Sequence, residues 1–173
     1  MRILKTSLFL LAIMLFSTYT VFAAPKVTAD NTTFDILSGT YKLNGNVRVE
    51  TGRYNITADR AQVNLTSLEV WAQKNITCIY NGDDNATPIN FTGDDLYGSW
   101  SNKTITVKGG THFTYGDLSI DSDQASFNWE TKIVDFTGNV IVQQNGKTTK
   151  YSDVKYNVID KKFINDTGNS ASQ

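Results

Sequence analysis

Apolar and polar residues alternate along most of the chain, and the alternating pattern returns four times. Each copy begins with a short motif that ends in aspartate: Val27–Asp30, Ile56–Asp59, Phe91–Asp94 and Ile120–Asp123. These aspartates are 29, 35 and 29 residues apart, and a polar insertion at residues 81–85 accounts for the longer interval. A fifth, degenerate copy starts at Ser152. Such a period is typical of repeat proteins, in which stacked units bury their apolar faces against each other.

Within each copy the apolar residues recur with a period of two, which indicates strands. Pairs stand four and six, eleven and thirteen, and seventeen and nineteen residues after each aspartate; the last copy has Phe127 and Trp129, Val134 and Phe136, and Val140 and Val142. Each repeat is therefore predicted to be a strand, turn, strand, turn, strand unit.

Two sets of small or polar pairs are the predicted turns. The pairs that end sixteen residues after each aspartate are Gly45-Asn46, Lys74-Asn75, Gly109-Gly110 and Gly138-Asn139. Glycine and asparagine adopt positive φ at low cost, so this set predicts tight hairpins. The second set is Ser38-Gly39, Thr66-Ser67, Ser101-Asn102 and Glu130-Thr131. The alternation also slips by one residue at each aspartate, which predicts a β-bulge there, with the carboxylate capping nearby backbone N–H groups.

These elements predict an all-β fold, a twisted antiparallel β jelly roll built from about four stacked strand-turn-strand repeats and open at both ends. Its domain is expected to span residues 24–164, and residues 165–173, which lack apolar periodicity, are expected to be a disordered tail.

The N-terminal segment predicts export. Arg2 and Lys5 precede an apolar run, and the segment Val21–Ala24 follows, with small residues at its end. This is the pattern of a secretory signal peptide, residues 1–23, cleaved after Ala23. The alternative is an uncleaved membrane anchor, but Ser17, Thr18 and Thr20 interrupt the apolar run.

Candidate catalytic chemistry is sparse. A net charge of -1 gives no basic surface for nucleic acid. Cys78 lies in an apolar column and is expected to be a buried free thiol, and His112, the only histidine, is expected to be a surface residue without metal-ligating neighbours. We therefore predict a non-enzymatic protein with no metal site and no cofactor. Eight Asn-x-Thr triplets, from Asn31 to Asn165, would suggest surface glycosylation in a eukaryotic secreted protein.

Three segments carry a family resemblance. Residues 27–49, 56–64 and 120–144 combine the Ala-Asp or Ser-Asp start, a strand and the Gly-Asn-Val-x-Val element. They resemble the OstA-like domain, most of all the LptA-type periplasmic components of lipopolysaccharide transport. The repeat from Phe91 to Gly116, with glycines at 98, 109 and 110, departs from this pattern.

The resemblance implies a periplasmic lipid carrier that binds lipopolysaccharide acyl chains in an apolar groove. It also implies partners: itself, head to tail through the terminal strands, and the inner-membrane and outer-membrane transport components, so that the chain bridges the two membranes. The residues expected to contact lipid are Val47, Val49, Val63, Leu65, Ile76, Ile105, Val107, Phe113, Phe127, Trp129, Phe136, Val140 and Val142. Plain core packing is the alternative role for each of them.

Three other functions share these features. A membrane-anchored OstA-like subunit of the LptC type would keep residues 1–23 and hand lipid to the bridge. A structural or adhesive exported β-repeat protein would have a filled interior and bind no amphiphile. A secreted glycoprotein would have a mass well above the 19.2 kDa of the bare chain.

Overall fold

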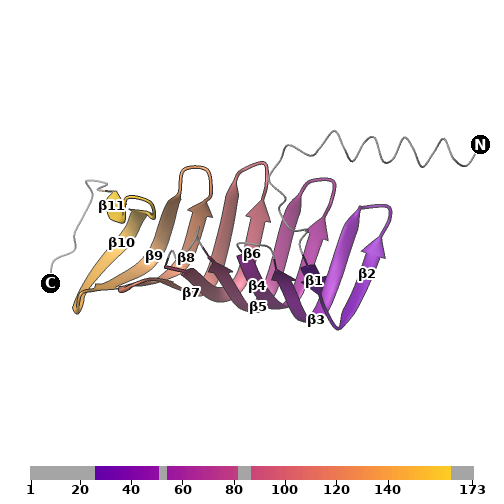
Figure 1. Cartoon of the computed structure of the whole chain (residues 1–173), viewed down its shortest axis with the longest axis horizontal. Coiled ribbons are helices and arrows are strands. Elements are labelled where there is room, and N and C mark those ends of the chain that lie inside the picture. Colours follow the sequence, from indigo (N-terminus) through magenta and orange to yellow (C-terminus); the bar gives the residue numbers. More distant parts are fainter. Residues whose placement is uncertain (1–25, 51–53, 82–86, 165–173) are drawn as a thin grey trace, which may run out of the picture.

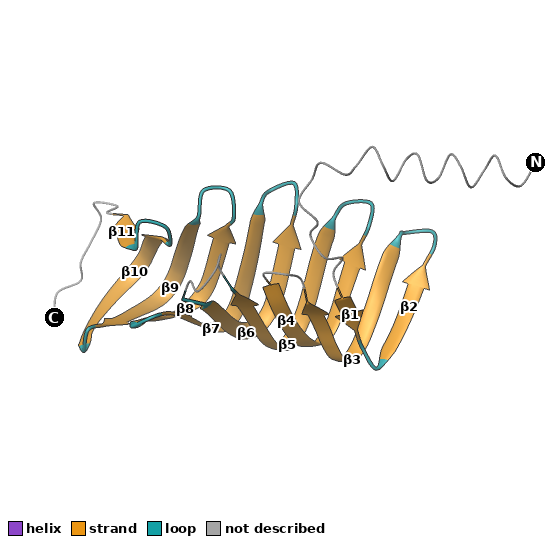
Figure 2. Cartoon of the chain, viewed as in Figure 1, coloured by secondary structure: helices purple, strands orange, loops and turns teal. Residues whose placement is uncertain are grey.

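The computed structural model describes residues 26–50, 54–81 and 87–164, which form one open sheet of eleven strands (Figures 1 and 2). The strands are β1 (Lys26–Thr28), β2 (Asn31–Asp35), β3 (Thr40–Glu50), β4 (Tyr54–Asn64), β5 (Glu69–Tyr80), β6 (Ile89–Ser99), β7 (Thr104–Tyr115), β8 (Leu118–Asn128), β9 (Ile133–Gln144), β10 (Lys147–Asn157) and β11 (Lys162–Ile164). The all-β prediction is confirmed. The expected signal peptide, the tail and most of the polar insertion lie outside the described residues.

The sheet follows chain order. From β3 to β11 each strand pairs antiparallel with the next, and β1 and β2 both pair with β3. The jelly-roll topology is not confirmed, because the pairing is that of a meander. The sheet ends at β1 and β2 on one side and at β10 and β11 on the other, so its two edges are open, as predicted.

Each long strand bends in its middle, and this corrects one part of the sequence prediction. The Gly45-Asn46 pair was expected to be a hairpin turn, but it lies inside β3, where the register with β4 shifts between Asn44 and Val47. The repeat unit therefore has two long bent strands and not three short ones. Both members of the pair do have positive φ, 76° and 46°. A bulged bend needs such residues as much as a tight turn does, so the same sequence signal fits both structures.

The bulge predicted at each aspartate is confirmed at the later repeats. Register shifts occur between Thr57 and Arg60, between Thr92 and Asp95, and between Asp121 and Gln124. The aspartate of one strand thus faces the positive-φ pair of the next strand. Together they form a continuous line of bends, which we call the spine.

The second set of turns is confirmed. Four-residue turns connect successive strands at their upper ends in Figure 1. The turns are residues 36–39, 65–68, 100–103, 129–132 and 158–161. Asp35, Asn64, Asn128 and Asn157 each accept backbone N–H groups two and three residues later. Such Asx turns lock the backbone of a turn. The backbone capping that was expected from Asp30, Asp59 and Asp123 is therefore made by the residues five positions later, Asp35, Asn64 and Asn128.

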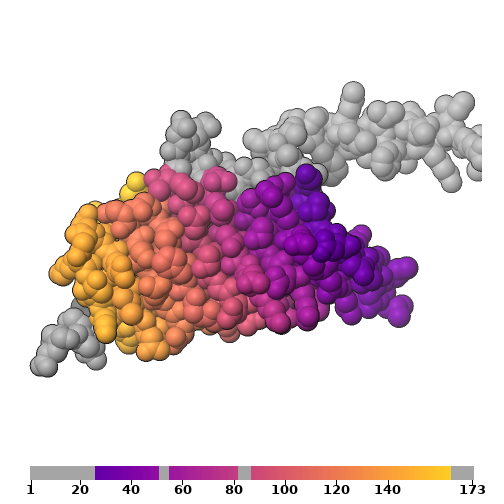
Figure 3. Space-filling model, turned by 90° about the horizontal axis from the view of Figure 1, so that it is seen from below, coloured from indigo at the N-terminus to yellow at the C-terminus, as the bar shows by residue number. Residues whose placement is uncertain are grey.

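The bend divides the sheet into two walls. The upper wall holds the strand segments between the spine and the four-residue turns, such as residues 40–44 and 133–137. The lower wall holds the other halves, such as 47–50 and 140–144. The buried apolar side chains lie on the inner faces of both walls, and Figure 3 shows the molecule from below as a closed surface from the N-terminal to the C-terminal strands.

Candidate apolar lipid-binding interior

The inner faces carry apolar rows that cross the sheet from strand to strand. In the lower wall one row runs through Val49, Ile56, Cys78, Phe91, Phe113, Ile120 and Val142. In the upper wall the row nearest the turns runs through Phe34, Tyr41, Val63, Val70, Gly98, Ile105, Phe127, Val134, Tyr156 and Phe163. Antiparallel pairing in register brings these side chains together on one face of the pleat. The predicted continuous apolar interior is therefore present.

The C-terminal half of this interior is closed. Phe113 of the lower wall packs against Phe136 and Tyr156 of the upper wall, with ring centroids 5.1 and 6.4 Å apart. Phe113, Phe136 and Val140 are each 0% exposed. The two walls therefore meet here in a packed aromatic core.

The middle of the interior contains a very small cavity. It is lined by Cys78, Tyr80, Ile89, Phe91, Ile105, Val107 and Phe127, from both walls, and its volume is about 10 Å³. That is about the space that one water molecule needs. An acyl chain would fit only if the walls moved apart.

The N-terminal end of the interior is partly open. Phe34 and Tyr41, whose rings lie 4.4 Å apart, are 45% and 36% exposed. Val63 and Val70, next along the same row, are half-buried, as are Val49 and Ile56 opposite. The exposure of the apolar lining thus decreases from β2 towards β10.

The predicted lipid-contact residues divide by this gradient. Those that lie buried in the core are Val47, Ile76, Val107, Phe113, Phe127, Phe136, Val140 and Val142. Val49, Val63, Ile105 and Trp129 are half-buried, and Leu65 is 51% exposed in a four-residue turn. The prediction left out Tyr41, Ile56 and Val70, although Tyr41 and Val70 occupy the same repeat column as Ile105 and Val134. Their position, eleven residues after the repeated aspartate, was the signal that could have identified Tyr41 and Val70.

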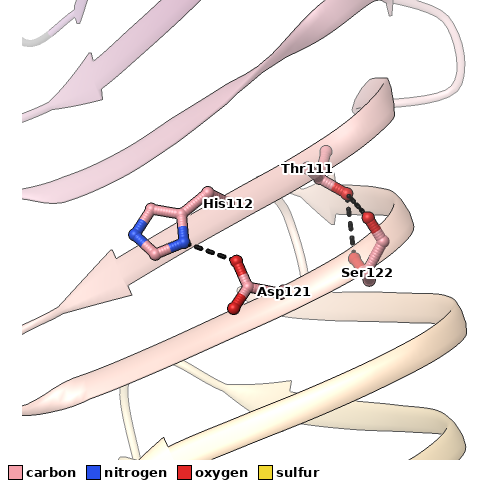
Figure 4. A network of polar contacts seen from close by, with 4 residues as sticks. All are labelled: Thr111, His112, Asp121 and Ser122. Atoms are coloured by element: carbon pink, nitrogen blue, oxygen red, sulfur yellow. Dashed lines mark hydrogen bonds and ion pairs between the residues drawn. The ribbon is translucent and has the colours of Figure 1, made fainter.

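Two of the polar pairs that join β7 and β8 differ in their position. One lies on the outer face of the sheet, and the other is buried at the spine. On the outer face, His112 Nδ1 is 2.7 Å from Asp121 Oδ1, and both side chains are nearly half exposed (Figure 4). The surface position predicted for His112 is confirmed. Thr111 and Ser122 are buried at the bend, where their hydroxyl oxygens are 2.9 Å apart. In the described ranges no group of three or more His, Cys, Asp or Glu residues is arranged to hold a metal ion.

The thiol of Cys78 is buried, as predicted, and burial raises its pKa to about 12. A thiolate is disfavoured in an apolar interior because it loses its hydration. Cys78 therefore fills space in the core and is not a reactive group at neutral pH.

Several of the Asn-x-Thr asparagines hold the fold together. Asn64 caps its turn, Asn75 Nδ2 donates to the carboxylate of Asp59, and Asn90 Nδ2 donates to Thr114 Oγ1. The triplets recur partly because these structural positions recur with the repeat. A glycan on Asn75 or Asn90 would leave the side-chain amide only one hydrogen to donate.

Comparison with known proteins gives a family and a fold. A family model described as LptA/(LptD N-terminal domain) LPS transport protein matches residues 26–112. Among solved structures, the chain is similar to LptH, the LptA homologous periplasmic component of the conserved lipopolysaccharide transport device from Pseudomonas aeruginosa. The TM-score is 0.62 at 13% sequence identity, and the match covers 66% of this chain and 82% of that chain. No curated protein sequence matches.

The described residues also contain no helix with the length and apolar character required to cross a bilayer.

Proposed function

The chain belongs to the LptA/(LptD N-terminal domain) family of LPS transport proteins, and from this premise we propose that it is a non-enzymatic lipid carrier of the periplasm. The acyl chains of lipopolysaccharide lie against the apolar inner rows, while the sugars and phosphates remain in water. The similarity to LptH, described as a periplasmic component, supports this location.

The observation that carries the proposal is the two-walled apolar interior with a partly exposed N-terminal end. Half-buried Val49, Ile56, Val63 and Val70 offer apolar surface that the described residues leave partly uncovered. Each methylene that moves from water onto such a surface contributes about 0.8 kcal/mol. A few acyl carbons are therefore enough to favour binding there.

The gradient assigns two roles to the predicted contact residues. Val49 and Val63 contact the acyl chain first, together with Tyr41 and Val70, whereas Ile105, which lines the small central cavity, is reached only when the walls separate. The eight buried residues, among them Phe113 and Phe136, contact lipid only when the two walls separate. Because adjacent strands stay paired during such a motion, the spine is the hinge about which the walls can move apart.

The open sheet edges support the bridging part of the proposal. β1 and β2 end the sheet on one side, and the first half of β10 and β11 end it on the other. Edge strands present unpaired backbone groups that can pair with a further chain. Copies that join head to tail, and the inner-membrane and outer-membrane components at the ends, would make the apolar interior continuous between the membranes.

The experiment that tests the carrier function is displacement of a fluorescent amphiphile by lipopolysaccharide. Val63→Glu places a charge on the inner face, and Gln62→Glu places the same charge on the outer face of the same strand. We expect displacement by the native protein and by Gln62→Glu, and at least a tenfold weaker affinity for Val63→Glu. No displacement by the folded native protein, checked by circular dichroism, would favour the structural surface protein.

A further inference from the structure

Exposed apolar side chains gather on the four-residue turns of the upper wall, outside the interior described above. Their exposed fractions are Ile36 82%, Leu37 99%, Leu65 51%, Leu68 54%, Trp100 59% and Ile159 67%. The fourth turn adds Trp129, which is half-buried and packs on Trp100 of the third turn at 5.7 Å between ring centroids. We call this row the turn rim.

The turn rim is internally fixed. Backbone N–H groups of one turn donate to carbonyls of the previous one, from Leu65 to Gly39, Trp100 to Leu68, Trp129 to Lys103 and Val158 to Lys132. Successive turns are two strands apart, so they follow each other at roughly 10 Å and the row extends for about 40 Å. Figure 1 shows these turns side by side at the upper ends of the strands. The hydrogen bonds therefore hold the side chains of neighbouring turns in fixed positions relative to one another.

Lysine recurs on the rim at a position that does not favour it. Lys103, Lys132 and Lys161 occupy equivalent places in the last three turns, with φ of 56°, 61° and 53°. In the first turn this place is held by Gly39, for which positive φ is easy, and in the second by Leu68, with φ of 55°. The repeat thus places a lysine at the same position of three successive turns.

The charge of the rim is positive where the aromatic residues lie. Turns three to five and the start of β11 contain four lysines, Lys103, Lys132, Lys161 and Lys162, and two acidic residues, Glu130 and Asp160. Near the first two turns, Asp35 accepts bonds from its own turn and Glu69 accepts from Tyr97. The Nζ atom of Lys103 also lies 5.0 Å from the centre of the Trp100 ring.

From these features we propose that the turn rim is a docking surface for an anionic lipid bilayer. Tryptophan and aliphatic tips enter the boundary between head groups and acyl chains, and the neighbouring lysines contact anionic head groups. A protein partner is usually held by a few side chains anchored in pockets, whereas a bilayer takes up a row of separate side-chain tips. Leu65 and Trp129, which the sequence predicted as lipid contacts, lie in these turns and not in the two inner rows. The rim can therefore hold the carrier beside a membrane while the inner rows remain free for cargo.

The three tryptophans of the chain allow a direct test. Two lie on the rim, and Trp71, 38% exposed on the outer face of β5, lies off it. The exported protein is mixed with vesicles of phosphatidylcholine and phosphatidylglycerol that carry brominated acyl chains, which quench tryptophan on contact. In Trp71→Phe, which keeps the two rim tryptophans, we expect the tryptophan fluorescence to be quenched by the brominated vesicles and its emission to shift to the blue with unbrominated ones. In the double variant Trp100→Phe, Trp129→Phe, which leaves Trp71, we expect neither. Equal quenching of both reporters, or none in either, would overturn the proposal.

A second comparison tests the charge. The triple variant Lys103→Gln, Lys132→Gln, Lys161→Gln should bind these vesicles about fivefold more weakly for each lysine removed. The triple variant Lys108→Gln, Lys147→Gln, Lys150→Gln loses the same charge from exposed positions off the rim and should bind like the native protein. An equal loss in both would contradict a role of the rim. Amphiphile displacement should be unchanged in both, which separates this surface from the cargo site.

Discussion

Asn139 Nδ2 donates a hydrogen bond of 2.8 Å to Oδ2 of Asp123, sixteen residues earlier in the chain. The same bond joins Asn46 to Asp30 at 2.8 Å, and Asn75 contacts both carboxylate oxygens of Asp59 at 3.0 and 3.1 Å. These bonds tie the bend of one strand to the bend of the next along the spine. In the remaining repeat the position opposite Asp94 is Gly110, which has no side chain to donate.

Gly110→Asn should complete this series. Gly110 has φ +67°, in the same region as the three asparagines, and a Cβ there would meet nothing within 4 Å. We expect the free energy of unfolding in urea to rise by about 1 kcal/mol, the usual net value of one hydrogen bond. Gly146→Asn is the control, because it has φ +74° and equally open surroundings but lies in the β9–β10 turn, away from the spine. An equal rise in both would show that the bond to Asp94 is not the cause.

The closed C-terminal core makes a different prediction for two phenylalanines. Phe113→Ala removes a ring that is 0% exposed and should lower the free energy of unfolding by roughly 3–5 kcal/mol. Phe34→Ala removes a ring that is 45% exposed at the open end, so its cost should stay near or below about 1 kcal/mol. Chemical denaturation measures both. Similar costs would mean that the interior is not graded as described.

Cys78 gives the stability a defined dependence on pH. Burial raises its pKa from 9.0 to about 12, so the folded protein keeps the thiol protonated where the unfolded chain ionises. Its contribution is complete below pH 9 and is lost as the pH rises from 9 to 12. Between pH 8 and pH 10 we expect the native protein to lose about 1.4 kcal/mol more unfolding free energy than Cys78→Ala, in which other groups titrate alike. Parallel losses would show that the thiol is accessible to water.

Head-to-tail assembly predicts a directional disulfide. Thr28 of β1 and Lys150 of β10 end the same outer row of the lower wall, at opposite edges of the sheet. Thr28→Cys mixed with Lys150→Cys should give mixed dimers under mild oxidation, and each variant alone should give few. Thr77→Cys, in the middle of the same row, serves as the control for random collisions. A yield no higher for the mixture than for the control would argue against end-to-end pairing.

Much of this fold could be predicted because the repeat displays it several times. The slip of the alternation at Asp59, Asp94 and Asp123 located the spine, and the small residues at 66–67 located a turn that the structure confirms. The hairpin predicted at Gly45-Asn46 was wrong because positive φ serves a bend as well as a turn. Only the pairing of β3 with β4 on both sides of Gly45 distinguishes the two.

The state of the interior could not be predicted for a different reason. Val63 and Val134 occupy related apolar columns, yet Val63 is half-buried and Val134 is 0% exposed. The difference depends on how closely the two walls approach at each end, which is set by packing between residues far apart in the chain. Gly98 also depends on packing between strands. A Cβ on Gly98 would lie 2.7 Å from Cγ1 of Val70, so the side chain of Val70 occupies the space where a side chain of residue 98 would lie.

The most direct test of the carrier function is photocrosslinking to lipopolysaccharide from matched neighbours on β4 and β5. A photoreactive residue at Val63 or Val70 faces the partly open interior, and one at Gln62 or Trp71 faces outward from the adjacent position. We expect crosslinks to the acyl chains from Val63 and Val70 and none from Gln62 and Trp71. Equal crosslinking from both faces, or none from the inner positions of the folded protein, would contradict a lipid-binding interior.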